Sequence, residues 1–272
     1  MISSENNPKD FFSAGVNQYM SEHYLSGHRS YMSVRQTRYL KEIDHLDIKA
    51  KDGRSALDAG CGPGFLTHEI FQRGFTMSAF DISEKMVDAA RTLFNQDSEG
   101  SEAILKIGDI EKIPFQDDQF ELCVTAGVIE YLNTDDIALL ELNRVLKQDG
   151  YLIISVTNKF SPVGIFDGLL DFIKTKRFLL TISNFILKLL GNNPVLPRTF
   201  KIRKHSPQTF IENLERAGFE IQSKRYFYML PWPHPIDRLF PKVTHFLGSK
   251  IEFLSNSPLG LLSEGFLVVA KK

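Results

Sequence analysis

Short apolar runs alternate with amphipathic segments along much of the chain, and this alternation predicts its secondary structure. Strands are expected at residues 55–59, 76–80, 103–107, 120–126, 151–156, 219–228 and 265–270. Helices are expected at residues 65–73, 83–94, 135–146 and 206–217. The run at 120–126 is almost wholly apolar, as in a parallel strand that is covered on both faces. The pattern predicts an α/β protein with a doubly wound, mostly parallel sheet of seven strands.

The same pattern divides the chain into four segments. A helical arm is expected at residues 1–45, and a core that holds five of the strands at residues 46–157. An insert at residues 158–205 precedes a final segment, 206–272, that completes the sheet. An aromatic and proline-rich stretch from Tyr226 onward is expected to be irregular. The arm either packs against the main domain or folds over the mouth of a binding site.

The insert combines apolar and basic residues. Its middle predicts a helix with a wide apolar face, and residues 172–204 contain eight Lys or Arg and no acid. One interpretation is a helical lid that packs on the sheet and leaves its basic residues in water. Alternatively, the lid lines a pocket for a lipid-like and anionic substrate, or it contacts a membrane surface as a peripheral protein would.

Composition narrows the class of protein. The formal net charge is −1, so no global field attracts nucleic acid or membrane. The two cysteines, Cys61 and Cys123, lie in apolar strand contexts and are expected to be buried thiols rather than a disulfide. We recognise neither a signal peptide nor an apolar run of membrane-spanning length. These features favour a reduced, cytoplasmic location.

The chemistry is expected at the carboxyl ends of the strands, where open α/β sheets bind ligands. Gly60, Gly62 and Gly64 follow the first strand, as in a turn where a ligand approaches the backbone closely. Asp81 ends the second strand, where a carboxylate can accept hydrogen bonds from both ribose hydroxyls. Asp109 follows the third strand and could accept from an adenine amine while Ile110 covers the ring. An adenosine-containing ligand is therefore expected.

Two cofactor classes share this layout. A dinucleotide requires Gly-x-Gly-x-x-Gly, but Phe65 occupies the third glycine position here. The amino-acid part of S-adenosylmethionine carries no phosphate and needs only a close backbone and a few polar groups. The spacing therefore favours S-adenosylmethionine over a nicotinamide cofactor.

The stretch Leu57-Asp-Ala-Gly-Cys-Gly-Pro-Gly64 resembles the first motif of class I S-adenosylmethionine-dependent methyltransferases. Later segments, up to the turn at 146–151, resemble the following motifs in order and spacing, and the overall plan is loosely similar to that of ubiquinone-biosynthesis O-methyltransferases. The resemblance implies a Rossmann-like fold and methyl transfer, with contacts to the cofactor from Gly60, Gly62, Gly64, Asp81, Ile82, Asp109, Ile110 and the backbone of Ala126.

Two further residues are assigned by the same resemblance. Arg35 is expected near the carboxylate of the cofactor, although Arg38 is equally available from the sequence. Asp58 acts on the cofactor through the loop or a water, or it is a strand-end cap that holds the glycine turn. We expect His68 to be a surface residue, while His205 and His234 in the lid and tail have no predicted direction.

One departure from the ubiquinone enzymes concerns the acceptor. Their Glu-x-x-Glu-His motif after the fourth strand is associated with a metal and with deprotonation of a phenol. The corresponding residues here run from Gly127 to Glu130 and Tyr131, so one carboxylate remains. We therefore predict no metal site, and we assign Glu130 and Tyr131 as the candidate catalytic residues.

The predicted activity is methyl transfer to a small or lipid-like acceptor, with oxygen favoured. Methylation of nitrogen or carbon, and a cofactor-binding partner protein without turnover, are the alternatives. Ala126-Gly127-Val128 ends the fourth strand in place of an Asn-Pro-Pro-aromatic motif, which argues against nucleic acid as the substrate. No motif predicts an oligomeric state.

Overall fold

The computed structural model describes residues 30–46, 48, 53–97, 103–163, 165, 202–230 and 241–272, together with positions 9, 13, 16 and 20. Most of the predicted arm and lid, His234, and most of the proline-rich stretch lie outside the described residues. Among the described residues, no helix is long and apolar enough to cross a membrane.

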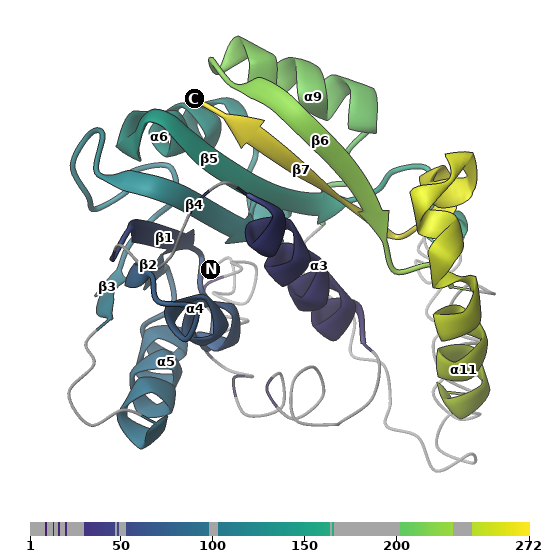
Figure 1. Cartoon of the computed structure of the whole chain (residues 1–272), viewed down its shortest axis with the longest axis horizontal. Helices are drawn as coiled ribbons and strands as arrows, with labels where there is room; N and C mark the ends of the chain where they lie inside the picture. The colour runs from purple at the N-terminus through teal and green to yellow at the C-terminus, as the bar shows by residue number, and fades with distance from the viewer. Residues whose placement is uncertain are drawn as a thin grey trace, which may run out of the picture.

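A seven-stranded sheet in the order β3-β2-β1-β4-β5-β7-β6 forms the centre of the molecule (Figure 1). β1 to β5 are parallel, and β7 is antiparallel to both of its neighbours. The predicted mostly parallel, doubly wound sheet is therefore confirmed. The strands are β1 (Ser55–Ala59), β2 (Thr76–Asp81), β3 (Ile104–Ile107), β4 (Phe120–Ala126), β5 (Leu146–Thr157), β6 (Glu220–Phe227) and β7 (Gly265–Lys271).

Helices cover both faces of the sheet (Figure 1). On one face lie α3 (Tyr31–His45), α4 (Phe65–Phe71) and α5 (Glu84–Asp97), and on the other lie α6 (Asp136–Val145) and α9 (Pro207–Arg216). Successive strand residues face opposite sides. Ala56 and Leu122 join the cluster with α3 and α4, whereas Leu57 and Cys123 join the cluster with α6 and α9.

Two local predictions need correction. Residues 147–150 belong to β5, which begins at Leu146 and carries an irregularity in its pairing with β4 between Phe120 and Leu122. His68, expected at the surface, is buried against the Phe94 ring, because α4 packs on α5 as well as on the sheet. The two cysteines are free and buried, as predicted.

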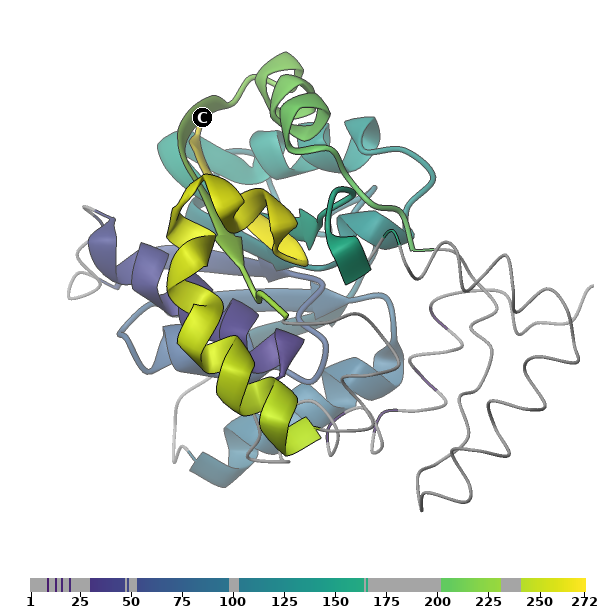
Figure 2. The same cartoon turned by 90° about the vertical axis from the view of Figure 1, so that its right-hand side faces the viewer.

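The sequence prediction missed the helical segment near the C-terminus. α11 (Pro241–Ile251) runs into two 3₁₀ helices, η4 (Glu252–Asn256) and η5 (Pro258–Leu262), before β7 begins. Figure 2 shows this segment on the outside of the molecule, beyond the edge strand β6. Glu252 fixes it to the end of β6, because its carboxylate accepts hydrogen bonds from the backbone N–H groups of Tyr228 and Met229 at 2.9 and 3.0 Å.

Candidate functional site

The glycine turn lies between β1 and α4 and is tied to β2. The N–H groups of Gly60 and Cys61 both donate to the Phe80 carbonyl, at 2.8 and 3.0 Å. Gly60, Gly62 and Gly64 all have positive φ, at 81°, 53° and 85°, a conformation that favours glycine. A Cβ at Gly62 would meet no heavy atom within 4 Å. At Gly62 the turn therefore presents bare backbone to open space, whereas a Cβ at Gly60 or Gly64 would collide with Val128 or Ala90.

Asp58 supports this turn from below. It is buried at the end of β1, and its Oδ2 accepts a hydrogen bond of 2.7 Å from the Thr67 hydroxyl on α4. The bond joins the strand to the helix across the turn. Burial raises the pKa of Asp58 to about 7, while the Thr67 bond opposes the increase.

Asp81 closes the turn from the neighbouring strand. Its Oδ2 accepts from Gly62 N at 2.9 Å, and its Oδ1 accepts from Ser83 N at 2.8 Å. Burial raises the pKa of this carboxyl above its usual range, although these backbone bonds favour the charged form. Each carboxylate oxygen can accept more than one hydrogen bond, so both retain capacity for a ligand. Ile82 beside it is 40% exposed.

The third acid lies one strand further out. Asp109 is exposed after β3, and its Oδ1 accepts from Glu111 N at 3.0 Å. Ile110 next to it packs in the core and is only 4% exposed. Of the two apolar candidates for contact with a ring, Ile82 is therefore the accessible one and Ile110 the buried one.

The structure separates Arg35 from Arg38. Arg35 is buried on α3, and its guanidinium fills the space that a Cβ on Gly127 would need, directly after Ala126 at the end of β4. Arg38 instead turns outward to Ser255 and Asn256 of η4, at 3.2 and 3.4 Å. Arg35 is thus the arginine that lies at the carboxyl edge of the sheet.

Glu130 lies in the short 3₁₀ helix η3 (Ile129–Tyr131) after β4 and is almost fully buried. Its Oε1 accepts from the N–H and the hydroxyl of Thr157, at 2.8 and 2.9 Å. Its Oε2 has no hydrogen-bond partner among the described residues. Burial, and then the nearby charge of Glu130, raise the pKa of Tyr31 above its usual range. Tyr131, the other candidate, is half-buried.

A second polar cluster centres on Asp135, which sequence reasoning missed. Oδ1 of this buried carboxylate lies 2.7 Å from Arg203 Nη2 and 3.1 Å from His205 Nε2, and Oδ2 accepts from Asn213 at 2.9 Å. Burial would raise the pKa of Asp135, but the bond and charge of His205, followed by Asn213 and Arg203, lower it. The partners lie 68 to 78 residues away along the chain. The sequence therefore showed only that Asp135 stands at the start of a predicted helix, and it did not show the partners.

The same cluster holds the two ends of the insert together. Asn158 and His205 form a parallel bridge, and the Arg203 N–H donates to the Glu130 carbonyl at 2.9 Å. The insert therefore leaves and rejoins the sheet domain beside Glu130. Most of its own residues lie outside the described ones.

These residues fit S-adenosylmethionine. The bare backbone at Gly62 leaves room for the amino-acid part, and the Asp81 carboxylate with the exposed Ile82 suits a nucleoside. The buried Arg35 cation suits a carboxylate. Among the described residues, no group of three His, Cys, Asp or Glu side chains is placed to hold a metal ion.

Comparison with known proteins agrees with this geometry. Residues 57–154 match the family described as a methyltransferase domain. A malonyl-acyl-carrier-protein O-methyltransferase of Erwinia billingiae is 33% identical over 105 residues, which are 39% of this chain and 39% of that protein. A demethylmenaquinone methyltransferase of Lactobacillus johnsonii is 30% identical over 182 residues, 64% of this chain and 70% of the relative.

The fold is also shared with solved structures. An S-adenosylmethionine-dependent methyltransferase of Mesorhizobium loti has a TM-score of 0.55 at 17% identity, over 88% of this chain and 98% of the other. The sequence relatives, the matched domain and the glycine turn agree on one cofactor class. The chain belongs to the class I S-adenosylmethionine-dependent methyltransferases.

Proposed function

We propose that the protein transfers the methyl group of S-adenosylmethionine to an oxygen atom of a small or lipid-like acceptor. The observation that carries the proposal is the buried Oε2 of Glu130, which has no partner among the described residues and lies at the carboxyl end of the sheet. A buried carboxylate oxygen without a donor is costly, and an acceptor hydroxyl would supply the donor.

The positions of the chain's own residues support the cofactor roles that we assign to them. Gly62 leaves space for the amino-acid part, and Gly60 and Gly64 give the turn its shape. Asp81 accepts from the ribose hydroxyls, and Arg35 with the Ala126 backbone faces the cofactor carboxylate. Asp109 and the exposed Ile82 contact the adenine, while Ile110, the residue expected from the sequence to cover the ring, packs in the core. Asp58 acts indirectly, because its bond to Thr67 fixes the turn. When bound, the sulfonium supplies an activated methyl group, so the protein contributes mainly alignment.

Glu130 and Tyr131 are the residues assigned to the acceptor. A hydroxyl is a weak nucleophile until its proton is accepted, and a carboxylate in hydrogen-bond reach can accept it. Thr157 holds Glu130 by its other oxygen and so fixes the side chain. The Erwinia relative, whose name is that of an O-methyltransferase, adds support for oxygen as the methylated atom. A predicted membrane contact through the lid lies outside the described residues.

The test is an untargeted search for methylated products. Purified protein is incubated with methyl-labelled S-adenosylmethionine and a metabolite and lipid extract, and labelled products are identified by mass spectrometry. We expect a labelled ether or ester with the wild type. Glu130→Gln should lower the rate about a hundredfold while cofactor affinity changes little, because general acid–base groups contribute roughly 100- to 10,000-fold. Asp81→Asn should instead weaken cofactor binding.

Other outcomes point elsewhere. A labelled amine or carbon product would replace oxygen with the alternative acceptor atoms. Tight cofactor binding with no labelled product from any extract would favour the cofactor-binding partner protein. Equal methylation rates for Glu130→Gln and wild type would show that Glu130 does not act on the acceptor.

A further inference from the structure

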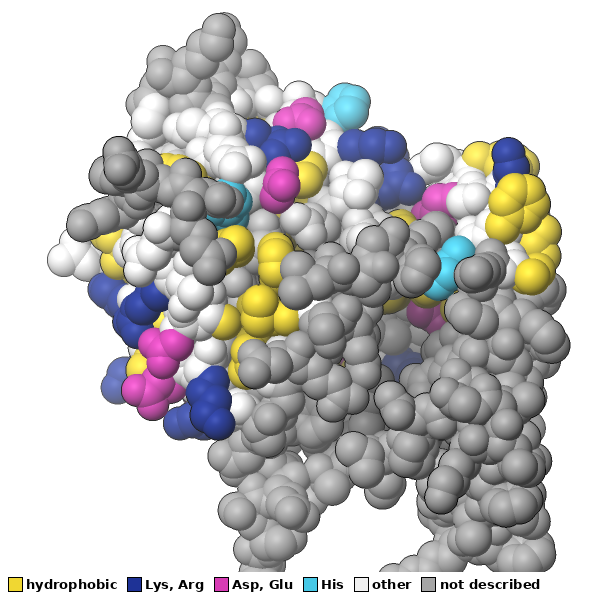
Figure 3. Space-filling model, turned by 90° about the horizontal axis from the view of Figure 1, so that it is seen from below, with side chains coloured by type: hydrophobic (Ala, Val, Ile, Leu, Met, Phe, Trp, Pro, Cys, Tyr) yellow, Lys and Arg dark blue, Asp and Glu magenta, His cyan; other side chains and the backbone are white. Residues whose placement is uncertain are grey.

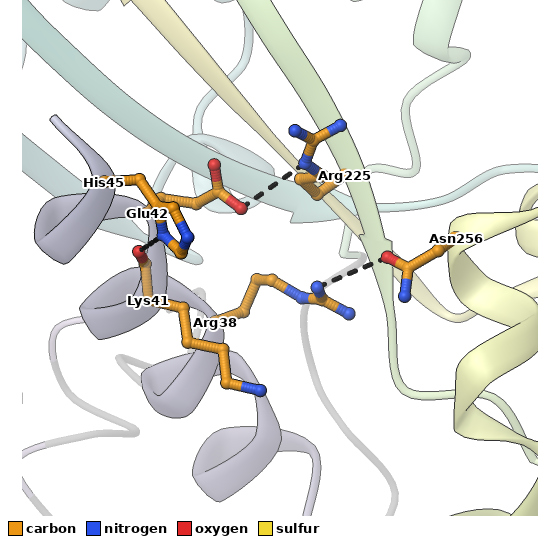
Figure 4. A pocket seen from close by; sticks show the side chains of 6 residues that line it. All are labelled: Arg38, Lys41, Glu42, His45, Arg225 and Asn256. Atoms are coloured by element: carbon orange, nitrogen blue, oxygen red, sulfur yellow. Dashed lines mark hydrogen bonds and ion pairs between the residues drawn. The ribbon is translucent and has the colours of Figure 1, made fainter.

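A pocket of about 400 Å³ opens between α3, β6 and η4. It is lined by Arg38, Lys41, Glu42, His45, Arg225 and Asn256. Figure 4 shows Arg38 reaching across from α3 toward Asn256, and Arg225 reaching from β6 toward Glu42. None of these residues belongs to the proposed methyl-transfer site.

The pocket carries an excess of positive charge. Three of its residues are cations and one is an acid, Glu42, whose carboxylate lies 3.5 Å from Arg225. The Arg38 guanidinium is held by Ser255 and Asn256, so its position is fixed. The exposed Lys41 ammonium has no ion-pair or hydrogen-bond partner among the described residues. Guanidinium and ammonium groups that line a concave surface are the groups that bind phosphate in proteins.

An exposed apolar stripe runs along α11 and η4. Val243, Phe246 and Phe253 are 49%, 61% and 69% exposed, and Lys250 lies among them with its ammonium 5.7 Å from the Phe246 ring centre. Positions 243, 246 and 250 follow α-helical spacing and therefore share one face of α11, and Phe253 follows in the 3₁₀ helix η4. α11 contains no Asp or Glu. Figure 3 shows hydrophobic and basic side chains together at the right-hand margin, where Figure 1 places α11.

The stripe leads to the pocket. Phe253 and Asn256 are three residues apart in η4, and side chains at that spacing eclipse one another in a 3₁₀ helix. The two features therefore form one surface, which we call the α11–pocket surface and define as Arg38, Lys41, Arg225, Phe246, Lys250 and Phe253. Exposed aromatic rings beside basic side chains are the composition of peripheral membrane-binding surfaces.

We propose that the α11–pocket surface docks on a bilayer that contains anionic phospholipid. The pocket takes a headgroup phosphate, and Phe246 and Phe253 enter the boundary between headgroups and acyl chains. The combination favours a lipid surface over a protein partner, since the pocket cations match the phosphates and the exposed rings match the acyl boundary. This docking is independent of methyl transfer.

The test is sedimentation of the full chain with vesicles. One set contains equal parts of phosphatidylglycerol and phosphatidylcholine, and the other contains phosphatidylcholine alone. We expect the wild type to sediment with the anionic vesicles only. Binding to these vesicles should be at least tenfold weaker for the double variant Phe246→Ser/Phe253→Ser and several-fold weaker for Lys41→Glu. The matched control is Ile137→Ser/Leu140→Ser, which removes two apolar side chains of α6 that are also more than half exposed, and it should bind like wild type.

Each contrary result overturns the proposal. The proposal is contradicted if the wild type fails to sediment, if it sediments equally with both vesicle types, or if the Phe246→Ser/Phe253→Ser and Lys41→Glu variants bind as strongly as wild type. Inorganic phosphate that binds wild type but not Lys41→Glu, together with no sedimentation on anionic vesicles, would assign the pocket to free phosphate instead of a headgroup. Cofactor binding by each variant verifies that it is folded, and it leaves the proposed methyl transfer testable on its own.

Discussion

Arg35 and Gly127 occupy mutually exclusive space, because the Arg35 guanidinium lies where a Cβ on Gly127 would be. Gly127→Ala should therefore push Arg35 away from the end of β4 and weaken S-adenosylmethionine binding about tenfold, measured by titration calorimetry. Gly218→Ala is the matched control, because Gly218 also has positive φ but lies after α9, beside Asn143. The Gly218→Ala variant should be less stable than wild type but should bind the cofactor with unchanged affinity.

Substitution of the two arginines of α3 should have different effects on S-adenosylmethionine affinity in the same calorimetric assay. Arg35→Gln removes the cation beside Gly127, and loss of a hydrogen bond to a charged group costs about 1.5–3 kcal/mol. Cofactor affinity should fall about tenfold or more. Arg38→Gln should leave it unchanged, since Arg38 contacts η4. Equal losses in both variants would contradict the assignment of Arg35 to the cofactor.

Asp58 makes the stability of the folded protein depend on pH. Burial raises its pKa from 3.8 to about 7, so the folded protein holds a proton that the unfolded chain releases above about pH 4. Stability from this group therefore falls as the pH rises from about 4 to about 7. Each pH unit in that window changes the free energy of unfolding by at most about 1.4 kcal/mol. Between pH 5 and pH 7 the wild type should therefore lose about 2 kcal/mol of stability relative to Asp58→Asn, which has no proton to release.

Urea unfolding of the cofactor-free protein at several pH values measures this difference. An asparagine oxygen can still accept from Thr67, so the variant is expected to fold. Asp88→Asn, an exposed substitution on α5, serves as the control and should run parallel to wild type. A constant difference between Asp58→Asn and wild type across the range would show that Asp58 is ionised in the folded state.

Asp135 should matter to stability far more than its neighbour Asp136. Asp135→Asn leaves Arg203 and His205 without their buried carboxylate and should cost about 3 kcal/mol at neutral pH by chemical denaturation. Because the folded pKa of Asp135 is lowered, its contribution is lost as the pH falls through that folded value, and the cost of the variant should shrink in acid. The exposed Asp136→Asn should change stability little.

The sheet and the glycine turn were predictable because their signals are local. Each strand is a short apolar run, and the positive φ values of Gly60, Gly62 and Gly64 need glycine at those positions. The choice between Arg35 and Arg38 was not predictable, since both lie on one helix and only the packing of β4 and η4 separates them. The Asp135 cluster depends on residues from distant segments. α11 escaped notice because its apolar stripe faces outward and does not mark a core.

The position of β7 has a consequence for how the chain folds. β7 lies between β5 and β6, so these two strands cannot pair with each other directly. Until residues 265–271 have left the ribosome, β5 is therefore an open edge whose residues 152–156 are apolar or small and destined for burial. A nascent or truncated chain without β7 would expose that edge to other chains. The sheet can therefore be completed only after β7 has been synthesised, and the aggregation hazard of this protein is concentrated in the interval before that step.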